Sequence, residues 1–290
     1  MIPDRTMWPP KNGSRRMTQL AVMAAGLTWL TPILSGQERE ETPAQREIEK
    51  RRMEVMTSRI EAIAISSRDA GIPRQMQMTP LFRYDDETRG YVDGTVWRLG
   101  EKGRPLAIIT AELHPHYLNN GPRVVYDLLS LTDRPFTAVS EDIPGWTPGK
   151  SAVAIKPLPR APVPSPAAAR RLTQLKEQAR RFSGTQEVDE LEKTFVHLRL
   201  MPREIDRYAP ASNELADGAI FLFANGRNPA ILVLIETNGT DWQYGIGRLS
   251  MPSTLEMKLD GGVVWSQPRI PSSPGWSEPY NASNSPAEFP

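Results

Sequence analysis

The 290-residue chain contains no cysteine and only three histidines. The absence of cysteine excludes disulfide bonds, thiolate nucleophiles and cysteine-based zinc or iron–sulfur sites. Neither sign of charge is in excess, since 35 lysines and arginines stand against 34 aspartates and glutamates. Without a field of one sign, the chain lacks the usual electrostatic basis for binding nucleic acid. We therefore expect no nucleic-acid partner.

The apolar run near the N-terminus is too short for a typical membrane span. It covers residues 20–34, about 15 positions, whereas a transmembrane helix needs about 20. Two adjacent arginines precede it and the small residues Ser35 and Gly36 follow, which is the layout of a secretory signal peptide. We predict a signal peptide over residues 1–36 and a periplasmic or secreted protein with no stable membrane span after cleavage. An uncleaved anchor is the alternative, and both the general secretory and the twin-arginine routes stay open.

Several residues recur at one offset of 124 positions, which indicates an internal duplication. Coincidental similarity of two β-meanders is the alternative. The recurring residues are Arg83 and Arg207, Tyr84 and Tyr208, Asp93-Gly94 and Asp217-Gly218, Pro105 and Pro229, and Glu112 and Glu236; Tyr126 and Tyr244 recur at an offset of 118, and Trp146 and Trp265 at 119.

Each recurring block begins with a helix signal and continues with short alternating strands. Thr42 and Ser165 each precede a proline, as N-caps do, and Gln45 completes a capping box with Thr42. The two recurring Asp-Gly pairs are interpreted as turns between antiparallel strands. The sequence therefore predicts the α+β class, with two tandem copies of a unit made of one amphipathic helix plus a mainly antiparallel β-sheet. Strands are expected over 75–84, 94–99, 105–114, 123–132 and 135–140 in the first copy, and over 195–208, 218–224, 229–237, 242–250 and 254–260 in the second.

The proline distribution sets the expected domain boundaries. Residues 42–150 form the first unit and 166–268 the second, and a proline-rich linker over 151–165 separates them. The tail over 269–290 is rich in Pro, Ser and Asn, and is expected to be disordered.

The duplicated pieces carry a resemblance. The Arg-Tyr pairs, the Asp-Gly pairs followed by Thr-Val-Trp or Ala-Ile-Phe, and the Gly-Arg pairs, all behind a signal peptide, are similar to uncharacterised exported proteins of planctomycete-type bacteria. The resemblance covers residues 42–268. It implies export and internal duplication, and it assigns no activity and no catalytic residue.

One group of residues could bind a metal ion. If the strand over 105–114 continues, Glu112, His114 and His116 lie on one face at a spacing of two residues. One carboxylate and two imidazoles are ligands for Zn²⁺ or a similar divalent metal. Pro115 interrupts this pattern and no fourth ligand is visible, so the alternative is that the histidines are polar loop residues after an edge strand.

The duplicated charged residues Glu112, Glu236, Arg83 and Arg207 are the candidate binding residues. Both glutamates end mostly apolar strands, and they could bind a ligand. The alternative is a structural ion pair, either with Arg83 and Arg207 or with the arginines of the two Gly-Arg pairs.

These observations predict an exported, non-enzymatic binding or structural module. Its partner would be a small molecule, a polymer or a protein of the cell envelope, and no cofactor is expected. The alternative is an extracytoplasmic metal-dependent hydrolase or metalloprotein that uses Glu112, His114 and His116. A polar pocket with perturbed titratable groups near Glu112 would favour the enzyme.

Overall fold

The computed structural model describes residues 42–67, 79–86, 90–100, 103–208 and 215–290, so the expected signal peptide lies outside the described residues. Residues 42–290 form one compact unit. Its elements are α1 (Pro43–Glu61), β1 (Ala64–Ser66), β2 (Phe82–Asp86), β3 (Tyr91–Leu99), β4 (Ala107–His114), the 3-10 helix η2 (Tyr117–Asn119), β5 (Arg123–Ser130), β6 (Thr137–Val139), β7 (Lys156–Pro157), α2 (Ala168–Ala179), β8 (Phe182–Asp189), β9 (Thr194–Leu200), β10 (Asp206–Tyr208), β11 (Asp217–Asn225), β12 (Asn228–Thr237), β13 (Trp242–Arg248), β14 (Leu255–Leu259), β15 (Gly262–Gln267) and β16 (Tyr280–Pro286).

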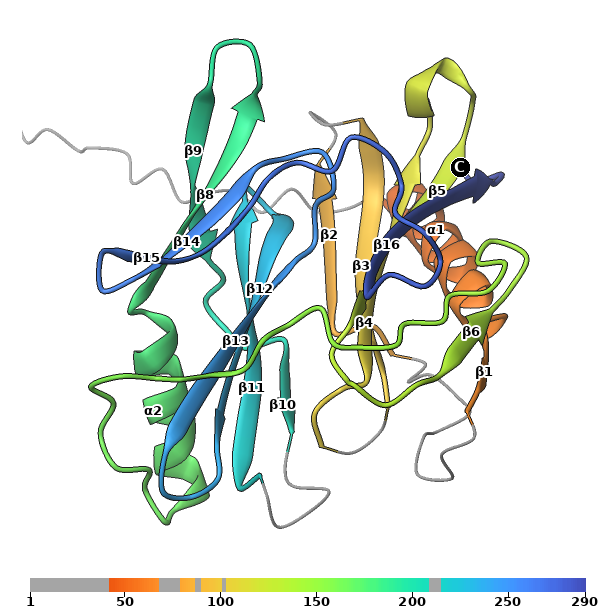
Figure 1. The fold of residues 1–290 in the computed structure, drawn as a ribbon. Coiled ribbons are helices and arrows are strands. Elements are labelled where there is room, and N and C mark those ends of the chain that lie inside the picture. The colour runs from red at the N-terminus through yellow and green to blue at the C-terminus, as the bar shows by residue number, and fades with distance from the viewer. Residues whose placement is uncertain (1–41, 68–78, 87–89, 101–102, 209–214) are drawn as a thin grey trace, which may run out of the picture. The chain divides into compact units, whose positions relative to one another are not determined.

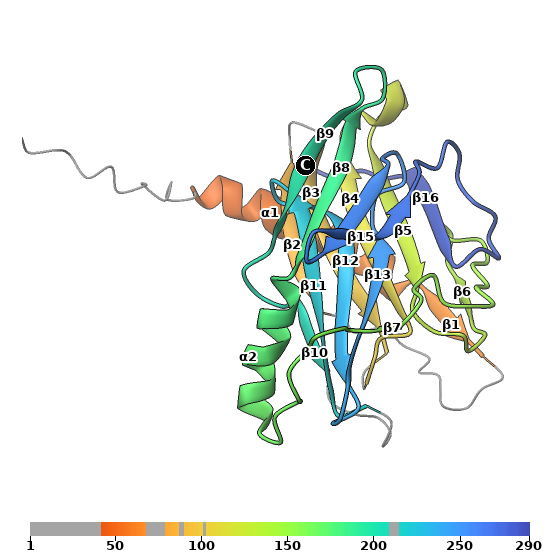
Figure 2. The same ribbon diagram turned by 60° about the vertical axis from the view of Figure 1, so that its left-hand side comes forward.

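Antiparallel pairing joins these strands into two main sheets. The first sheet has five strands in the order β16-β5-β4-β3-β2. The second has nine strands in the order β15-β14-β8-β9-β11-β12-β13-β7, with β10 also paired to β11. The curl of this second sheet is visible in Figure 1 and, from the side, in Figure 2. Strands β1 and β6 form a separate short pair.

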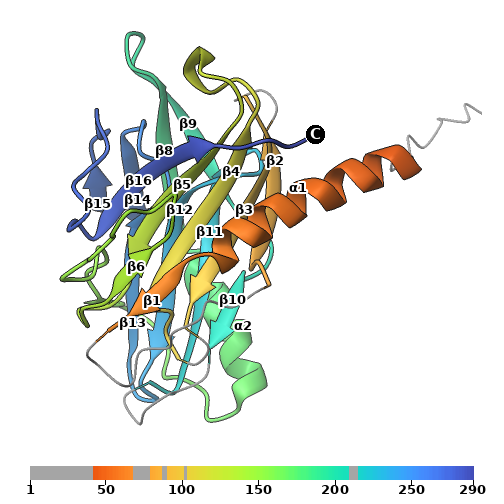
Figure 3. The same cartoon turned by 90° about the vertical axis from the view of Figure 1, so that its right-hand side faces the viewer.

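The two sheets pack face to face, and each carries one helix on its outer face (Figures 1 and 3). Helix α1 buries Met56 and Ile60 against the first sheet, and α2 buries Leu175 and Ala179 against the second. A third apolar cluster joins the inner faces of both sheets. It includes Val96, Ile108 and Leu129 from the first sheet and Ile220, Leu222, Leu232 and Leu234 from the second.

The expected α+β class with tandem helix-plus-sheet units is wrong. The described part of the chain is mostly β, with two α-helices and one large curled sheet. Neither half is self-contained either, because β7 from the expected linker extends the second sheet and β16 from the C-terminal tail extends the first. The sequence pattern was misinterpreted because strands buried on both faces carry no sign of what covers the second face.

The expected disorder of the tail is wrong over 280–286. This segment pairs with β5 along its whole length, from Tyr280 opposite Leu129 to Pro286 opposite Arg123. Backbone hydrogen bonds make this pairing, so the Asn, Ser and Pro content of the segment does not prevent it. The capping box of Thr42 and Gln45, in contrast, is confirmed.

The recurring Tyr, Gly and Glu residues occupy the same register in both sheets. In the first sheet Tyr84 lies opposite Gly94, and Gly94 lies opposite Glu112. In the second, Tyr208, Gly218 and Glu236 are paired in the same way. A Cβ atom at Gly94 would lie 2.6 Å from the Tyr84 ring, so glycine is needed to let the ring lie across the strand. The Asp-Gly pairs interpreted as turns are therefore inside β3 and β11.

Candidate functional site

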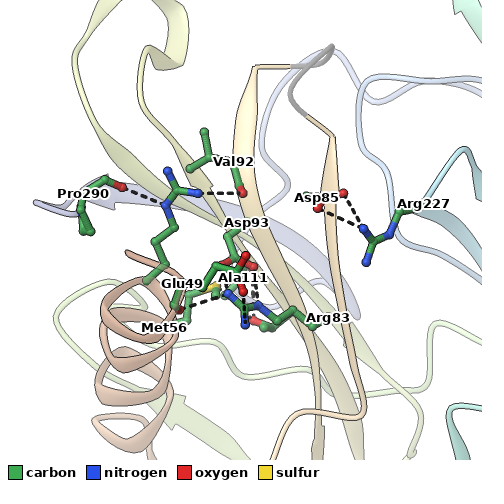
Figure 4. A network of polar contacts seen from close by, with 11 residues as sticks. Glu49, Met56, Arg83, Asp85, Val92, Asp93, Ala111, Arg227 and Pro290 are labelled. Atoms are coloured by element: carbon green, nitrogen blue, oxygen red, sulfur yellow. Dashed lines mark hydrogen bonds and ion pairs between the residues drawn. The ribbon is translucent and has the colours of Figure 1, made fainter. Parts of the chain in front are cut away.

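Arg83 and Arg207 attach the helices to the sheets. The Arg83 guanidinium donates to Asp93 at 2.9 and 2.5 Å and to the backbone carbonyl of Glu49 in α1 at 3.1 Å (Figure 4). Arg207 repeats this arrangement with Asp217 and the carbonyl of Ala168 in α2. Hydrogen bonding to these carboxylates raises the pKa of both arginines. Both arginines therefore form structural ion pairs with aspartates, and not with Glu112 or Glu236 as the alternative expected. Neither arginine lines the cavity described below.

The carboxylate of Glu236 is fully buried and fully paired. Arg104 reaches it from the other half of the chain and donates from Nε and Nη2 to its two oxygens, at 2.7 and 2.5 Å. Tyr208 donates to Oε1 at 2.7 Å and Gln243 donates to Oε2 at 3.1 Å. The fork of Arg104 therefore neutralises this carboxylate, and the hydrogen bond with Glu236 raises the pKa of Arg104.

Glu112 has the same position in the first sheet but a different environment. Tyr84 donates to its Oε1 at 3.0 Å, and His114 Nε2 lies 3.0 Å from Oε2. Among the described residues, no lysine or arginine forms an ion pair with Glu112. Arg227, which corresponds to Arg104, instead pairs with the exposed Asp85 at 3.0 Å (Figure 4). The Glu112 side chain is 15% exposed, whereas that of Glu236 is 0% exposed.

Glu112 faces a cavity of about 640 Å³. Its walls come from β3, β4 and β5 of the first sheet, the η2 loop, the end of β8, the start of β12, the segment after β13, and the C-terminal segment with β16. Many lining side chains are polar. Besides the hydroxyls of two tyrosines, the lining hydroxyl and amide groups are those of Ser250, Ser253, Ser273, Ser283, Gln186, Asn228 and Asn284.

A second carboxylate, Asp127, lies beside Glu112 in this cavity. Thr110 of β4 faces Asp127 across the ladder and Val125 faces Glu112, so the two acids are diagonal neighbours on one face. Asp127 is buried; Tyr280 of β16 donates to its Oδ1, and Thr110 Oγ1 lies 3.3 Å from Oδ2. Burial, and then the nearby Glu112 charge, raise the pKa of Asp127 to about 7.

The second half has no room for a carboxylate at the position that corresponds to Asp127. That position is Gly245, which follows Tyr244 as Asp127 follows Tyr126. A Cβ atom at Gly245 would meet the side chain of Val153 and would lie 2.8 Å from Ile155. The apolar segment before β7 thus covers the second half where the first half has a polar cavity.

Aromatic rings form one wall of the cavity. The His114 ring lies 5.4 Å from the Tyr91 ring and 5.4 Å from the Tyr117 ring, centroid to centroid. Burial raises the pKa of Tyr117. At the rim, Leu118 has φ +47° and is 75% exposed. A left-handed backbone at a leucine is strained, and such strain often occurs at binding sites.

The structure brings together two of the three expected metal ligands. Glu112 and His114 are in contact, but strand β4 ends at His114 and His116 is an exposed loop residue that does not line the cavity. The side-chain alternation that would place His116 beside the other two therefore ends too early. In the described part of the chain, no group of three acidic or histidine side chains is arranged to hold a metal ion.

Sequence reasoning missed Asp127 and Tyr280. Asp127 stands in an apolar strand, and a charged residue buried there is a signal of a special environment that could have been used. Tyr280 gave no signal, because it lies in the tail that was expected to be disordered.

No protein-family model, curated protein or solved structure matches this chain. Within the described residues, no helix is long and apolar enough to cross a membrane.

Proposed function

We propose that this protein is an exported, non-enzymatic module that binds a small polar ligand in the cavity beside Glu112. The observation that carries the proposal is the contrast between the two corresponding glutamates. Glu236 is neutralised by an internal arginine and closed off, whereas Glu112 faces a cavity with a second carboxylate, aromatic rings and several hydroxyl groups. Concave sites with a few converging polar groups are the usual places for small ligands.

The contrast also supports an internal duplication with divergent roles. Strands β2 to β5 and β10 to β13 pair in the same order, and the bridge between Ala138 and Trp146 corresponds to the pairing of Met257 with Trp265. We infer that one copy keeps its glutamate as a core ion pair and that the other copy uses it at the ligand site. The tripartite N-terminus supports export, and N-terminal sequencing of the protein from the envelope fraction tests it.

A thermal-shift screen tests the binding role. Purified protein is heated with a library of amines, amino acids, sugars and small carboxylates, and the same screen is run on Glu112→Gln. A ligand at 100 times its Kd stabilises the native state by about 2.7 kcal/mol, which raises Tm by several degrees. We expect shifts that disappear in Glu112→Gln and persist in Glu177→Gln, which changes an exposed acid on α2. Equal shifts in wild type and Glu112→Gln, or no shift with any class, would overturn the proposal.

A second candidate function, acid–base hydrolysis, is favoured by Asp127. A carboxyl with a raised pKa beside a second carboxylate is the arrangement of a general acid with its partner. Turnover of chromogenic glycosides and esters should then fall above pH 7 and be lost in Asp127→Asn. The metal-dependent form of this activity would need a third ligand in addition to Glu112 and His114.

A further inference from the structure

The inference below rests on the proposed function and specifies its ligand. Glu236, which corresponds to Glu112 in the other sheet, shows what a carboxylate at this position binds. At Glu236, the Tyr-Gly-Glu arrangement holds a guanidinium with two parallel hydrogen bonds, at 2.7 and 2.5 Å. Arg104 supplies that guanidinium from outside the sheet that carries Glu236. Paired, short contacts of this kind are the strongest ones a carboxylate makes with a cation.

The Glu112 position preserves the same acceptor geometry. Tyr84 reaches Glu112 across the glycine of the strand between them, and Tyr208 reaches Glu236 in the same way, so each carboxylate is held by a tyrosine from the same register position. Burial raises the pKa of Tyr84 well above its usual value, so its hydroxyl stays a donor to the carboxylate. The difference is that the cation partner at Glu236 belongs to the chain, whereas Glu112 faces a cavity.

The charges around the cavity favour a cation. Four lining residues are acidic: Glu112, Asp127, Glu187 and Glu190. Glu190 pairs with Arg269 and Glu187 pairs with Lys193, so two of these four charges are already compensated. Among the described residues, Glu112 and Asp127 form no ion pair with a lysine or arginine, and the buried Arg248 acts on Asp127 through space. An anionic ligand would be repelled at the floor of the cavity by both carboxylates.

Aromatic rings beside the carboxylates favour a cation that also has an apolar part. Tyr91 and Tyr117 line the cavity, and each ring packs against the His114 ring. The faces of such rings attract guanidinium and ammonium groups. Leu118 and Val188 at the rim offer apolar contacts to the rest of the ligand.

We infer that the cavity binds an organic cation, a guanidinium or a primary ammonium on a short aliphatic chain, with the charged group held between Glu112 and Asp127.

Isothermal titration calorimetry with a matched pair of probes tests this inference. Butylguanidinium and butylurea have nearly the same shape, but only the first is charged. At pH 8 we expect butylguanidinium to bind at least tenfold more tightly than butylurea. Glu112→Gln should weaken butylguanidinium at least tenfold, Glu112→Asp should recover part of the loss, and Glu177→Gln should bind as wild type does. Circular dichroism of each variant checks that it is folded.

The pH dependence gives a second readout. Asp127 must lose its proton to bind a cation, so affinity for butylguanidinium should rise about tenfold between pH 6 and pH 8. This dependence should be absent in Asp127→Asn, which should bind weakly at both pH values. The charged and titratable groups facing Asp127 from the neighbouring elements are Glu112, Tyr84, Tyr117, Arg248 and Tyr280.

The outcomes separate this inference from the proposed function. If butylurea binds as well as butylguanidinium, or if only sugars and other neutral ligands give shifts that depend on Glu112, the inference of a cation is wrong and the binding role stands. If no probe and no library compound binds through Glu112, both are wrong.

Discussion

The Glu236 site and the Glu112 site share one arrangement and have opposite environments. Each has a tyrosine lying across a glycine, with a glutamate on the next strand accepting from the tyrosine hydroxyl. At Glu236 the strand opposite supplies Gln243 as a donor, and Arg104 completes the set. At Glu112 the residue opposite is Val125, whose side chain has no hydrogen-bond donor.

The difference shows how a core motif can become a binding site without a change in its backbone. The glutamate, tyrosine and glycine keep their register in both sheets, and the change lies in what covers them. Residues 152–155 fill the space over Gly245, whereas the position of Asp127 is covered by Tyr280 and opens to the cavity. The segments that lie over the two sites are loops and strand ends, and such segments tolerate substitution better than the strands of a packed sheet do.

The largest expected effect is at the closed site. Arg104→Met leaves the buried Glu236 carboxylate without its cation, which should lower the free energy of unfolding by about 3–5 kcal/mol. The double variant Arg104→Met/Glu236→Gln removes the uncompensated charge and should recover most of this loss. Urea denaturation of the single and double variants measures both effects. A single variant as stable as wild type would mean that the pair does not close this site as we describe.

The next effect is a pH dependence of stability that belongs to the open site. Asp127 has a pKa of about 7 in the folded protein and about 3.8 when unfolded, so the folded state holds its proton more tightly. Its contribution to the free energy of unfolding is therefore fully present below pH 4 and declines as pH rises through 7, by at most ~4 kcal/mol. The loss is complete about one pH unit above this pKa, near pH 8.

Asp127→Asn isolates this contribution. The stability of the variant relative to wild type should increase between about pH 4 and about pH 8 and then stay constant, as measured by urea denaturation at each pH. A difference that does not change with pH would show that Asp127 titrates normally and would remove it from the site.

The strands themselves could be predicted from the sequence. Alternating and β-branched residues mark β3, β4 and β5 and their counterparts β11, β12 and β13, and the expected ranges agree with the structure within a few residues. The recurring Arg, Tyr, Gly and Glu residues also marked the positions where the two halves resemble each other.

The layering and the site could not be predicted in the same way. Strands β11 and β12 are buried almost throughout, and an apolar strand does not say whether a helix or another sheet covers it. The cavity depends on Asp127 and Tyr280, which are 153 positions apart and meet because β16 pairs with β5. No local pattern contains that information.

A smaller effect tests the feature that the two sites share, a tyrosine ring lying across a glycine. Gly94→Ala and Gly218→Ala each place a methyl group against a buried tyrosine ring, Tyr84 or Tyr208. Overpacking of this kind costs about 1–3 kcal/mol, and we expect similar losses at the two positions. Thermal denaturation of both variants provides the comparison. A loss in one half alone would show that the tyrosine and glycine have different roles in the two sheets.

The smallest expected effect compares one side-chain contact at each glutamate. Gln243→Ala removes a donor from Glu236, whose carboxylate is 0% exposed, so an oxygen loses a partner that water cannot replace. We expect a loss of about 1–2 kcal/mol.

His114→Ala removes a contact from Glu112, which faces the cavity, and water can take the place of the imidazole. The expected loss in the free energy of unfolding is below about 1 kcal/mol. Urea denaturation of the two variants at one pH measures the difference. If His114→Ala costs as much as Gln243→Ala, the Glu112 carboxylate is as closed to water as that of Glu236, and the contrast on which the binding site depends fails.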